Sequence, residues 1–545
     1  MTTAEAMYKW NESRRMRLVG GYCPPIPAKR IIAPLPAQHH VVVQTPVKLY
    51  NAVSDGVRRP EVLSRHDLDI AYLQVWYDDK LPGASIVNTR HDQMMVEMSD
   101  LELSIDKISL TVAKCASVRR DKTTLKPVLR TMMPARRDRS QTESVLSIKR
   151  NTNAPVLTNE MDPEFICALL FDNFVESFVI DRALFEAFGD NELDVNPWLI
   201  QEWLTRQPPN VAAACESSEP LSMLWYGVFD FMIKSDVKPP LDKTAVNTYA
   251  SVQCISYQKK DISVIFCPVF CSMCERLMAV LAPNVLIFSD LSVTEFEDMV
   301  NDRFNAALLD VAAQVEIDMS KYDKSQSRAA LEFQCRLYAD LGMSAELIAI
   351  WRDAHLRSTI VDRMNGVKFD VECQRKSGDA KHFLRKTVFL MSVLAACYDF
   401  SDVMFGIFAG DDSVLYFRPG VFVEYDPSQR MADLFNLEAK LLKKYHFPYF
   451  CSKFLVVADG WLHFVPDPLK FVTKLDRCDI RDEQHLKEYA TSCEDSMARM
   501  FNDLMAQKLA FGVSERYGGT IYDITKLLRV LHAVVARGLK DLFKT

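Results

Sequence analysis

The sequence of 545 residues predicts an α+β fold that includes an antiparallel sheet. Two short apolar runs flank a Gly-Asp-Asp apex at 410–412, which is typical of a β-hairpin closed by a tight turn. Apolar and polar residues alternate over 315–320, the period of a half-buried strand. Longer amphipathic stretches with the helical period lie at 164–187, 484–508 and 524–543. With 49% hydrophobic and 25% charged residues, the chain can bury a large core.

The N-terminal part combines an extended segment with a basic one. Residues 1–110 contain early prolines and few long periodic stretches, which indicates an extended N-terminal segment. Between Lys114 and Arg150 there are eleven Lys or Arg against three Asp or Glu, although the net charge of the chain is −7. Such a segment is either a solvated basic loop or a surface that contacts RNA phosphates. The candidate contacts are Arg130, Arg136, Arg137, Arg139, Lys149 and Arg150.

Three cysteines and one apolar region bear on metal binding and membranes. Cys267, Cys271 and Cys274 would share one face of a helix, as core residues or as ligands of a metal ion. No fourth Cys or His lies close in the sequence, which favours the core. The fourteen cysteines are scattered, as expected in a reducing cytosol. No run of 18 apolar residues occurs, so neither a transmembrane helix nor a signal peptide is expected.

The strand predicted over 315–320 has two different faces. Its apolar residues share the packed face: Val315, Ile317 and Met319. Its polar residues share the other face: Glu316, Asp318 and Ser320. Asp318 therefore points away from the packed face. Downstream, the basic turn Gln374–Asp379 opens a predicted helix, whose buried stripe includes Leu384, Thr387 and Met391.

The hairpin apex carries two adjacent carboxylates, Asp411 and Asp412, directly after Gly410. Gly410 can adopt the positive φ that such a turn often needs. Adjacent carboxylates repel each other, so they are favoured where a divalent cation lies between them and a phosphate. The same tripeptide also occurs in ordinary surface turns, and the apex alone does not separate the two interpretations.

The order and spacing of these three segments match motifs A, B and C of viral RNA-dependent RNA polymerases. The chain resembles the polymerases of the alphavirus-like positive-strand RNA viruses, closest to the tobamovirus-like (virgavirus-like) branch. The resemblance rests on Asp318–Gln326, Gln374–Asp379 and Gly410–Phe417, and in part on 467–475. It covers roughly 110–480 well and the two ends weakly.

This resemblance implies a right-hand polymerase with fingers, palm and thumb. An N-terminal extension (1–110) would precede fingers with a basic motif F (111–309), a palm with motifs A to E and an antiparallel sheet (310–469), and a helical thumb (470–545). The implied activity is template-directed RNA synthesis from ribonucleoside triphosphates, which replicates and transcribes a positive-strand RNA virus genome. No P-loop or methyltransferase pattern is visible, so the sequence is expected to be the polymerase part of a replicase.

The chemistry implied by the resemblance is phosphoryl transfer at two Mg²⁺ (or Mn²⁺) ions. The implied metal ligands and catalytic carboxylates are Asp318, Asp411 and Asp412. Asp323 would recognise the ribose hydroxyls, and its alternative role is a helix N-cap. The other implied nucleotide contacts are Lys234, Lys238, Arg375, Ser377, Gly378 and Thr387, with Lys376 as an alternative to Arg375. Lys440, in a segment similar to motif D, would give a proton to the leaving pyrophosphate; its alternative is a solvated helix lysine.

Two residues depart from the family pattern in motif B. His382 stands where threonine is expected and Lys386 where asparagine is expected, four residues apart on one helix face. In the family the asparagine helps the residue at Asp323 to recognise the 2′-hydroxyl, whereas a lysine could pair with Asp323 instead. The rival hypothesis is therefore a catalytically impaired polymerase relative that binds RNA.

The resemblance also implies partners and a location. The partners are an RNA template, the nascent strand, nucleoside triphosphates and the viral methyltransferase-helicase replicase subunits. Host membranes would be contacted indirectly, through a replication complex in the host cytoplasm.

Overall fold

The structure is a computed structural model that describes most of 253–544 and several earlier segments, namely 65–80, 161–216, 225–234 and short stretches between 48 and 148. The chain divides into two compact units, Met1–Asp69 and Ile70–Thr545. In the first unit, β1 (Lys48–Leu49) pairs antiparallel with β2 (Glu61–Val62). The second unit contains all the sequence motifs described above, and the following paragraphs concern it.

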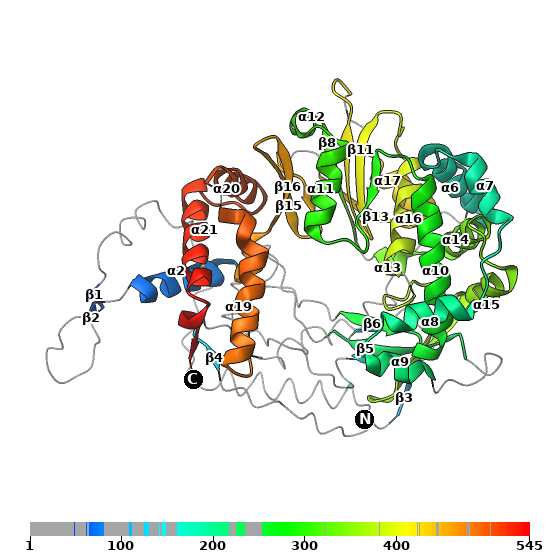
Figure 1. Cartoon of the computed structure of the whole chain (residues 1–545), viewed down its shortest axis with the longest axis horizontal. Helices are drawn as coiled ribbons and strands as arrows, with labels where there is room; N and C mark the ends of the chain where they lie inside the picture. Colours follow the sequence, from blue (N-terminus) through cyan, green and yellow to red (C-terminus); the bar gives the residue numbers. More distant parts are fainter. Residues whose placement is uncertain are drawn as a thin grey trace, which may run out of the picture. The chain divides into compact units, whose positions relative to one another are not determined.

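A five-stranded sheet contains both predicted strand segments (Figure 1). Its strand order is β13-β8-β12-β11-β7. The strands are β7 (Val285–Ile287), β8 (Gln314–Ser320), β11 (Val403–Ala409), β12 (Asp412–Phe417) and β13 (Glu438–Leu442). Neighbours run antiparallel except at the edge, where β7 runs parallel to β11. The α+β class is confirmed, and the sheet predicted to be antiparallel is mixed because of this edge strand.

Both faces of this sheet are covered, which explains the nearly continuous apolar sequence of β11 and β12. On one face, Ile317 and Leu415 belong to the largest hydrophobic cluster, together with helices that lie between residues 163 and 395. On the other face, Ile407 and Val414 pack in a second cluster with α11 (Val293–Arg303). The strand predicted over 315–320 is confirmed, with its apolar residues buried on one face.

The helices of the large cluster are α6 (Pro163–Phe178), α7 (Arg182–Gly189), α10 (Lys260–Val280), α14 (Arg328–Asp340), α15 (Ala345–Leu356) and α16 (His382–Ala395). The stretch predicted as one helix over 164–187 is two helices. Val179 is extended and forms an isolated bridge with Leu281, which ends α6. Asp181 then caps α7, because its carboxylate accepts a hydrogen bond from the N–H of Leu184 at 2.9 Å. The other helices near this core are α8 (Pro197–Thr205), α9 (Pro209–Glu216), α12 (Ala306–Val311), α13 (Tyr322–Ser325) and α17 (Ser428–Phe435).

Among the residues that the structure describes, helix α10 is the element that most resembles a membrane span. By length and composition it could cross a membrane, with a mean hydropathy of 1.6, although no transmembrane helix was expected from the sequence. Ten of its residues are buried, and its side chains pack against the helices of the large cluster. This packing is that of a core helix, and it explains why the helix is so apolar.

A second five-stranded sheet has the order β3-β10-β9-β5-β6. Its strands are β3 (Ile108–Leu110), β5 (Val228–Ile233), β6 (Cys254–Tyr257), β9 (Arg357–Asp362) and β10 (Val367–Glu372). In β10 every second residue is buried, and Phe369 packs edge-on against Phe231 of β5 in a small cluster of its own. This sheet adjoins the basic turn that precedes α16, because Gly378 donates a hydrogen bond from its N–H to the carbonyl of Ser256.

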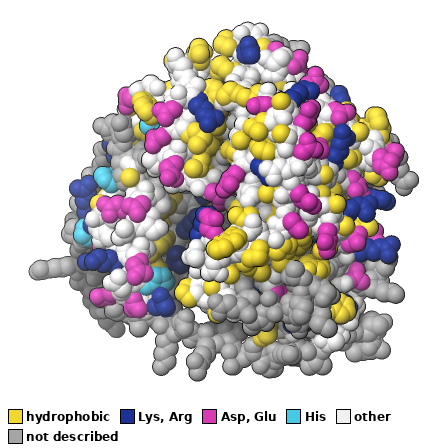
Figure 2. All heavy atoms as spheres, turned by 45° about the vertical axis from the view of Figure 1, so that its right-hand side comes forward, with side chains coloured by type: hydrophobic (Ala, Val, Ile, Leu, Met, Phe, Trp, Pro, Cys, Tyr) yellow, Lys and Arg dark blue, Asp and Glu magenta, His cyan; other side chains and the backbone are white. Residues whose placement is uncertain are grey.

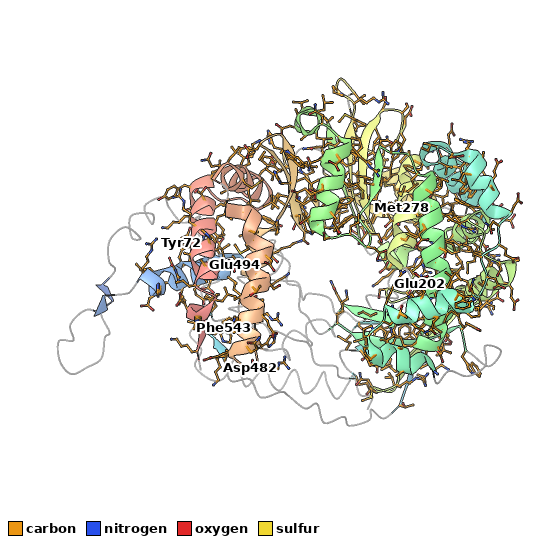
Figure 3. All side chains as sticks on the ribbon, in the orientation of Figure 1. Tyr72, Glu202, Met278, Asp482, Glu494 and Phe543 are labelled. Carbon is orange, nitrogen blue, oxygen red and sulfur yellow. The ribbon has the colours of Figure 1, made fainter. Side chains whose placement is uncertain are left out.

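The C-terminal part packs helices against a three-stranded sheet. The sheet contains β14 (Tyr449–Phe450), β15 (Lys453–Ala458) and β16 (Trp461–Pro466). The helical elements are α2 (Arg65–Lys80), α18 (Pro468–Val472), α19 (Glu483–Met497), η4 (Ala498–Phe501), α20 (Asp503–Tyr517), α21 (Ile521–Ala536) and η5 (Lys540–Leu542). Tyr72, labelled in Figure 3, belongs to α2. Its hydroxyl donates to the carbonyl of Asp523 at the start of α21. Strand β17 (Phe543–Lys544) pairs with β4 (Lys126–Pro127) near the end of the chain.

The two helices predicted in this part have different bounds. The stretch 484–508 is α19, the 3₁₀ turn η4 and the start of α20. Buried methionines on both sides of this break pack in the same cluster, so the apolar period continues through it. The stretch 524–543 ends as a helix at Ala536, and Gly538 then adopts a positive φ of 70°.

Candidate active site

The predicted hairpin is present, and a hydrogen bond to α16 holds its apex. Ala409 pairs with Asp412, so Gly410 and Asp411 form a two-residue loop. Gly410 has a φ of +67°, as the first loop residue of one common hairpin turn requires. Its N–H donates a hydrogen bond of 2.9 Å to Oγ1 of Thr387 in α16, which is fully buried. Thr387 therefore positions the apex, while the nucleotide contact predicted for it stays a prediction.

Thr387→Val should destabilise the fold by about 1–3 kcal/mol, because it leaves the buried N–H of Gly410 without its acceptor. Valine keeps the shape of the side chain, so packing is conserved. Urea denaturation measures the difference, and Thr387→Ser, which retains the hydroxyl, is the control. Equal stability of the valine and serine variants would show that the hydrogen bond does not hold the apex.

Three carboxylates meet at this end of the sheet. Ile317 of β8 pairs with Ser413 of β12. Because the two strands are antiparallel, Asp318, the residue after Ile317, lies at the same end of the sheet as Asp412 and Asp411, the two residues before Ser413. Burial, together with the charges of Asp411 and Asp318, raises the pKa of Asp412 to about 6. Burial also raises the pKa of Asp318; the charge of Lys440 lowers it and that of Asp411 raises it. The three groups thus repel one another in a partly desolvated place, which a cation would relieve.

The donor set fits a cation that is shared with a substrate. Within the described part of the chain, no group of three or more His, Cys, Asp or Glu side chains is arranged to hold an ion alone, and this includes Cys267, Cys271 and Cys274. Mg²⁺ usually binds through one or two carboxylates and completes its shell with water and substrate phosphates. Asp318, Asp411 and Asp412 are the residues that would hold such ions. The charge of Asp411 raises the pKa values of both Asp318 and Asp412, in keeping with their shared position at this end of the sheet.

Cations face these carboxylates from three other elements: Lys440 of β13, Lys470 of α18 and Arg516 of α20. Lys440 is exposed and pairs directly across the strands with Asp318, so it is not on a helix, which was the alternative interpretation. The thiol of Cys451 forms a hydrogen bond with Asp412, and burial raises the pKa of this thiol. The sequence assigns no role to Lys470, Arg516 or Cys451, because they reach the site only through the docking of α18, of α20 and of the turn between β14 and β15.

Asp323 and Lys386 form the ion pair that the departure in motif B predicts. The ammonium of Lys386 contacts Oδ1 of Asp323, and the two side chains are 13% and 30% exposed. The hydroxyl of Tyr322 also donates to the carbonyl of Lys386 at 2.8 Å, which ties α13 to α16. Asp323 lies inside α13, so its alternative role as an N-cap is wrong.

The basic turn before α16 is packed more tightly than its charge suggests. The guanidinium of Arg375 donates two hydrogen bonds to Oε1 of Gln326, at 2.8 and 2.7 Å. Lys376 is 1% exposed and its ammonium donates to Oγ of Ser358, while burial lowers its pKa to about 7. Arg375 is only half-buried, so it is the more accessible of the two, and the triphosphate contact stays a prediction. Ser377 donates from its hydroxyl to the carbonyl of a β6 residue at 3.3 Å.

Gly378 is required for this packing. A Cβ atom at this position would lie 2.7 Å from Cβ of Tyr257 and 2.8 Å from Cγ2 of Ile255. Gly378→Ala should therefore destabilise the fold by about 1–3 kcal/mol and displace the turn from β6. Thermal unfolding measures this, with Gly189→Ala as the control, since its Cβ would meet nothing closer than 3.8 Å. Equal melting temperatures for the two variants would contradict the close approach.

The predicted RNA contacts lie outside the described residues: Arg130, Arg136, Arg137, Arg139, Lys149, Arg150 and also Lys238. Lys234 is described; it is exposed directly after β5 and its N–H donates to the carbonyl of Gln253. On the face drawn in Figure 2, acidic and basic side chains are interspersed among hydrophobic ones. The described residues on this face therefore do not form a continuous basic field.

The sequence profile of the RNA dependent RNA polymerase family matches residues 98–544. The chain belongs to this family. It is 32% identical over 474 residues to the replicase large subunit of Tobacco rattle virus, which covers 86% of this chain and 27% of that protein. It is 30% identical over 456 residues to the replicase large subunit of Tomato mosaic virus, 82% of this chain and 27% of the relative.

A third relative is the RNA replication protein of Citrus leprosis virus C, 30% identical over 488 residues, 89% of this chain and 19% of that protein. The polymerase chain thus spans between 19% and 27% of the length of these relatives. The tobamovirus-like resemblance of the sequence is confirmed, and so is the identity of the chain as an RNA-directed RNA polymerase of a positive-strand RNA virus type.

Proposed function

We propose that this polymerase copies an RNA template from ribonucleoside triphosphates by two-metal phosphoryl transfer, and so replicates and transcribes a positive-strand RNA virus genome. One observation carries the proposal. Asp318 and the Asp411–Asp412 apex come from distant parts of the sequence, and they lie side by side at one end of the sheet of β8, β11 and β12.

The right-hand architecture is part of this proposal. The sheet β13-β8-β12-β11-β7 would be the palm, predicted over 310–469, although its edge strand β7 (Val285–Ile287) comes from before that range, and α19 to α21 would be the thumb, within 470–545. The helices α6 to α10 would belong to the fingers, predicted over 111–309, after an N-terminal extension over 1–110. The sheet with β5 and β6 would belong there too, although its strands β3, β9 and β10 come from outside that range. The separate hydrophobic clusters of the C-terminal helices and of the helices beside β8 support this division.

The carboxylates Asp318, Asp411 and Asp412 would hold two divalent ions, Mg²⁺ or Mn²⁺. Such ions make a 3′-hydroxyl nucleophilic and stabilise a leaving pyrophosphate. The protein's own part is to keep the three carboxylates ionised and in place. Thr387 fixes the apex through Gly410, and the cations of Lys440, Lys470 and Arg516 favour the charged form of Asp318.

Lys440 is the proposed proton donor to the pyrophosphate. It is exposed and lies directly across the strands from Asp318, so it can reach an anion held beside that carboxylate. A general acid must lie near the atom that it protonates, and this position meets that condition. Asp323 with Lys386 would face the ribose, while Lys234, Lys238, Arg375, Ser377 and Gly378 would surround the triphosphate.

The rival hypothesis, a catalytically impaired polymerase relative that binds RNA, is supported only by the Asp323–Lys386 pair. It is not favoured, because all three catalytic carboxylates are present and adjacent. The proposed partners of the enzyme are template and nascent RNA, nucleotides, methyltransferase-helicase replicase subunits and, indirectly, host membranes. The proposed location is a replication complex in the host cytoplasm.

Primer extension on a defined RNA template tests the proposed function. When only the four ribonucleotides are supplied with Mg²⁺ or Mn²⁺, the purified chain should incorporate the one complementary to each template base. Omitting the template and adding a chelator are the controls. Incorporation that ignores the template, or that persists in the chelator, would contradict template-directed synthesis by a metal-dependent site.

A further inference from the structure

A buried ion pair links the C-terminal helices to the strand that carries Asp318. Arg516, near the end of α20, donates to both carboxylate oxygens of Glu316, at 2.9 and 2.7 Å. Glu316 lies two residues before Asp318 and on the same face of β8. The two side chains are 18% and 6% exposed. A bidentate fork of this kind fixes distance and orientation together.

The guanidinium of Arg516 also contacts an aromatic ring. It lies over the ring of Tyr449, 4.0 Å from the centroid, and the N–H of Tyr449 donates to Oε2 of Glu316 at 3.1 Å. The hydroxyls of Tyr449 and of Tyr517 both donate to Oδ2 of Asp467, at 2.8 and 2.5 Å. Three segments far apart in the sequence are thus joined directly beneath the carboxylates: β8, the stretch from β14 to α18, and the end of α20.

The burial of Glu316 makes its partner essential. Glu316 is 6% exposed, and without the two donors of Arg516 the remaining hydrogen bond described above would be the one from the N–H of Tyr449. Removal of the guanidinium would therefore leave a buried carboxyl group without its main partners, two residues from Asp318. Arg516 also acts electrostatically on Asp318 itself. Arg516 therefore affects both the position of β8, through the fork, and the electrostatic environment of Asp318.

We propose that Arg516 is a positioning residue of the polymerase reaction, whose fork to Glu316 fixes β8 so that Asp318 faces the Asp411–Asp412 apex. The active site is then complete only while α20 is docked on β8. This inference rests on the proposed function, in which the three carboxylates share the metal ions. A displacement of a reacting group by about 1 Å can cost on the order of a hundredfold in rate.

The chain offers a matched control for this fork. Arg352 of α15 makes a similar bidentate pair with Glu332 of α14, with bonds of 3.1, 2.9 and 2.6 Å, on elements that carry none of the catalytic carboxylates. Lysine keeps the charge of arginine but cannot form the fork. R516K and R352K therefore make the same chemical change at two places, and only one of them supports β8.

The test compares kcat, KM for the nucleotide, melting temperature and the Kd for Mn²⁺ by calorimetry. R516K is expected to lower kcat about fivefold to tenfold, to change KM less than twofold and to weaken Mn²⁺ binding about threefold or more. R352K is expected to alter only the melting temperature. The double variant E316Q/R516Q, which keeps the net charge of the pair, should behave like R516K and replaces it if R516K does not fold.

A value of kcat for R516K within twofold of that for R352K would overturn the positioning role. If the unmodified chain makes no RNA, the proposed function fails, and the Mn²⁺ comparison then decides on the positioning role alone. Equal Mn²⁺ affinities of R516K and R352K would in that case reject it, and a weaker affinity of R516K alone would support it.

Discussion

Asp411→Asn is expected to abolish nucleotide incorporation and to leave the fold intact. Asparagine has the shape of aspartate, but it lacks the charge that a divalent ion requires beside Asp318 and Asp412. Loss of a charge that stabilises the transition state typically costs several kcal/mol of barrier, which is about a hundredfold to a thousandfold or more in rate. Single-nucleotide incorporation with Mg²⁺ measures the loss.

The control for this variant is Asp459→Asn. Asp459 also lies at the apex of a hairpin, between β15 and β16, and it is exposed. Its replacement should leave the rate unchanged, because that apex carries no second carboxylate from a neighbouring strand. Near-normal incorporation by the Asp411 variant, or an equal loss in the two variants, would contradict the catalytic assignment.

The stability of the Asp411 variant provides an independent check. Because the charge of Asp411 raises the pKa of Asp412, the two carboxylates destabilise the folded state when both are ionised. A carboxyl group whose pKa is raised on folding costs stability above its folded pKa, here about 6, and costs none well below its unfolded pKa. In a chelator at pH 7, Asp411→Asn should therefore melt no lower than the unmodified chain, and any gain should disappear as the pH falls toward 4.

The parts of the site that could be predicted are those with a local sequence signal. The alternation over 315–320 orients Asp318, because successive side chains of a strand point to opposite faces. The Gly410 turn requires a residue that tolerates positive φ, and the adjacent aspartates are visible without any tertiary information. The ion pair between Asp323 and Lys386 followed from the helical spacing of motif B together with the family resemblance.

The supporting residues could not be predicted, because they depend on how distant segments dock. Nothing in the sequence around Arg516 indicates that the end of α20 meets β8. Lys376 belongs to a basic turn, which suggests an exposed side chain, but it is buried. Thr387 was predicted as part of a buried stripe and as a nucleotide contact, but the hydrogen bond by which its hydroxyl holds Gly410 was not predicted. Helix ends were also missed, at Val179 and near η4, since the apolar period continues through both breaks.

The departure in motif B leads to the second large expected effect. Lys386 is paired with Asp323, and in the proposed active site Asp323 faces the ribose of the incoming nucleotide. Because this ammonium competes with the sugar hydroxyls for Asp323, the unmodified chain should incorporate nucleotides slowly and discriminate weakly between ribose and deoxyribose. Replacing Lys386 by Asn and His382 by Thr should raise the rate about tenfold or more, since each 1.4 kcal/mol of recovered binding is a factor of ten.

The ratio of ribonucleotide to deoxyribonucleotide incorporation is the sharper measurement, because effects on RNA and triphosphate binding cancel in it. Asp323 and Lys386 are partly exposed, so added salt screens their attraction and frees Asp323 for the sugar. The ribose preference of the unmodified chain should therefore increase with salt, whereas that of the double variant should be high and nearly constant. Lys368→Asn, at an exposed lysine of β10, is the control, and it should change neither the ribose preference nor its dependence on salt. If the unmodified chain is already fast and strongly prefers ribonucleotides at low salt, Lys386 does not compete for Asp323, and the pair is only a contact between α13 and α16.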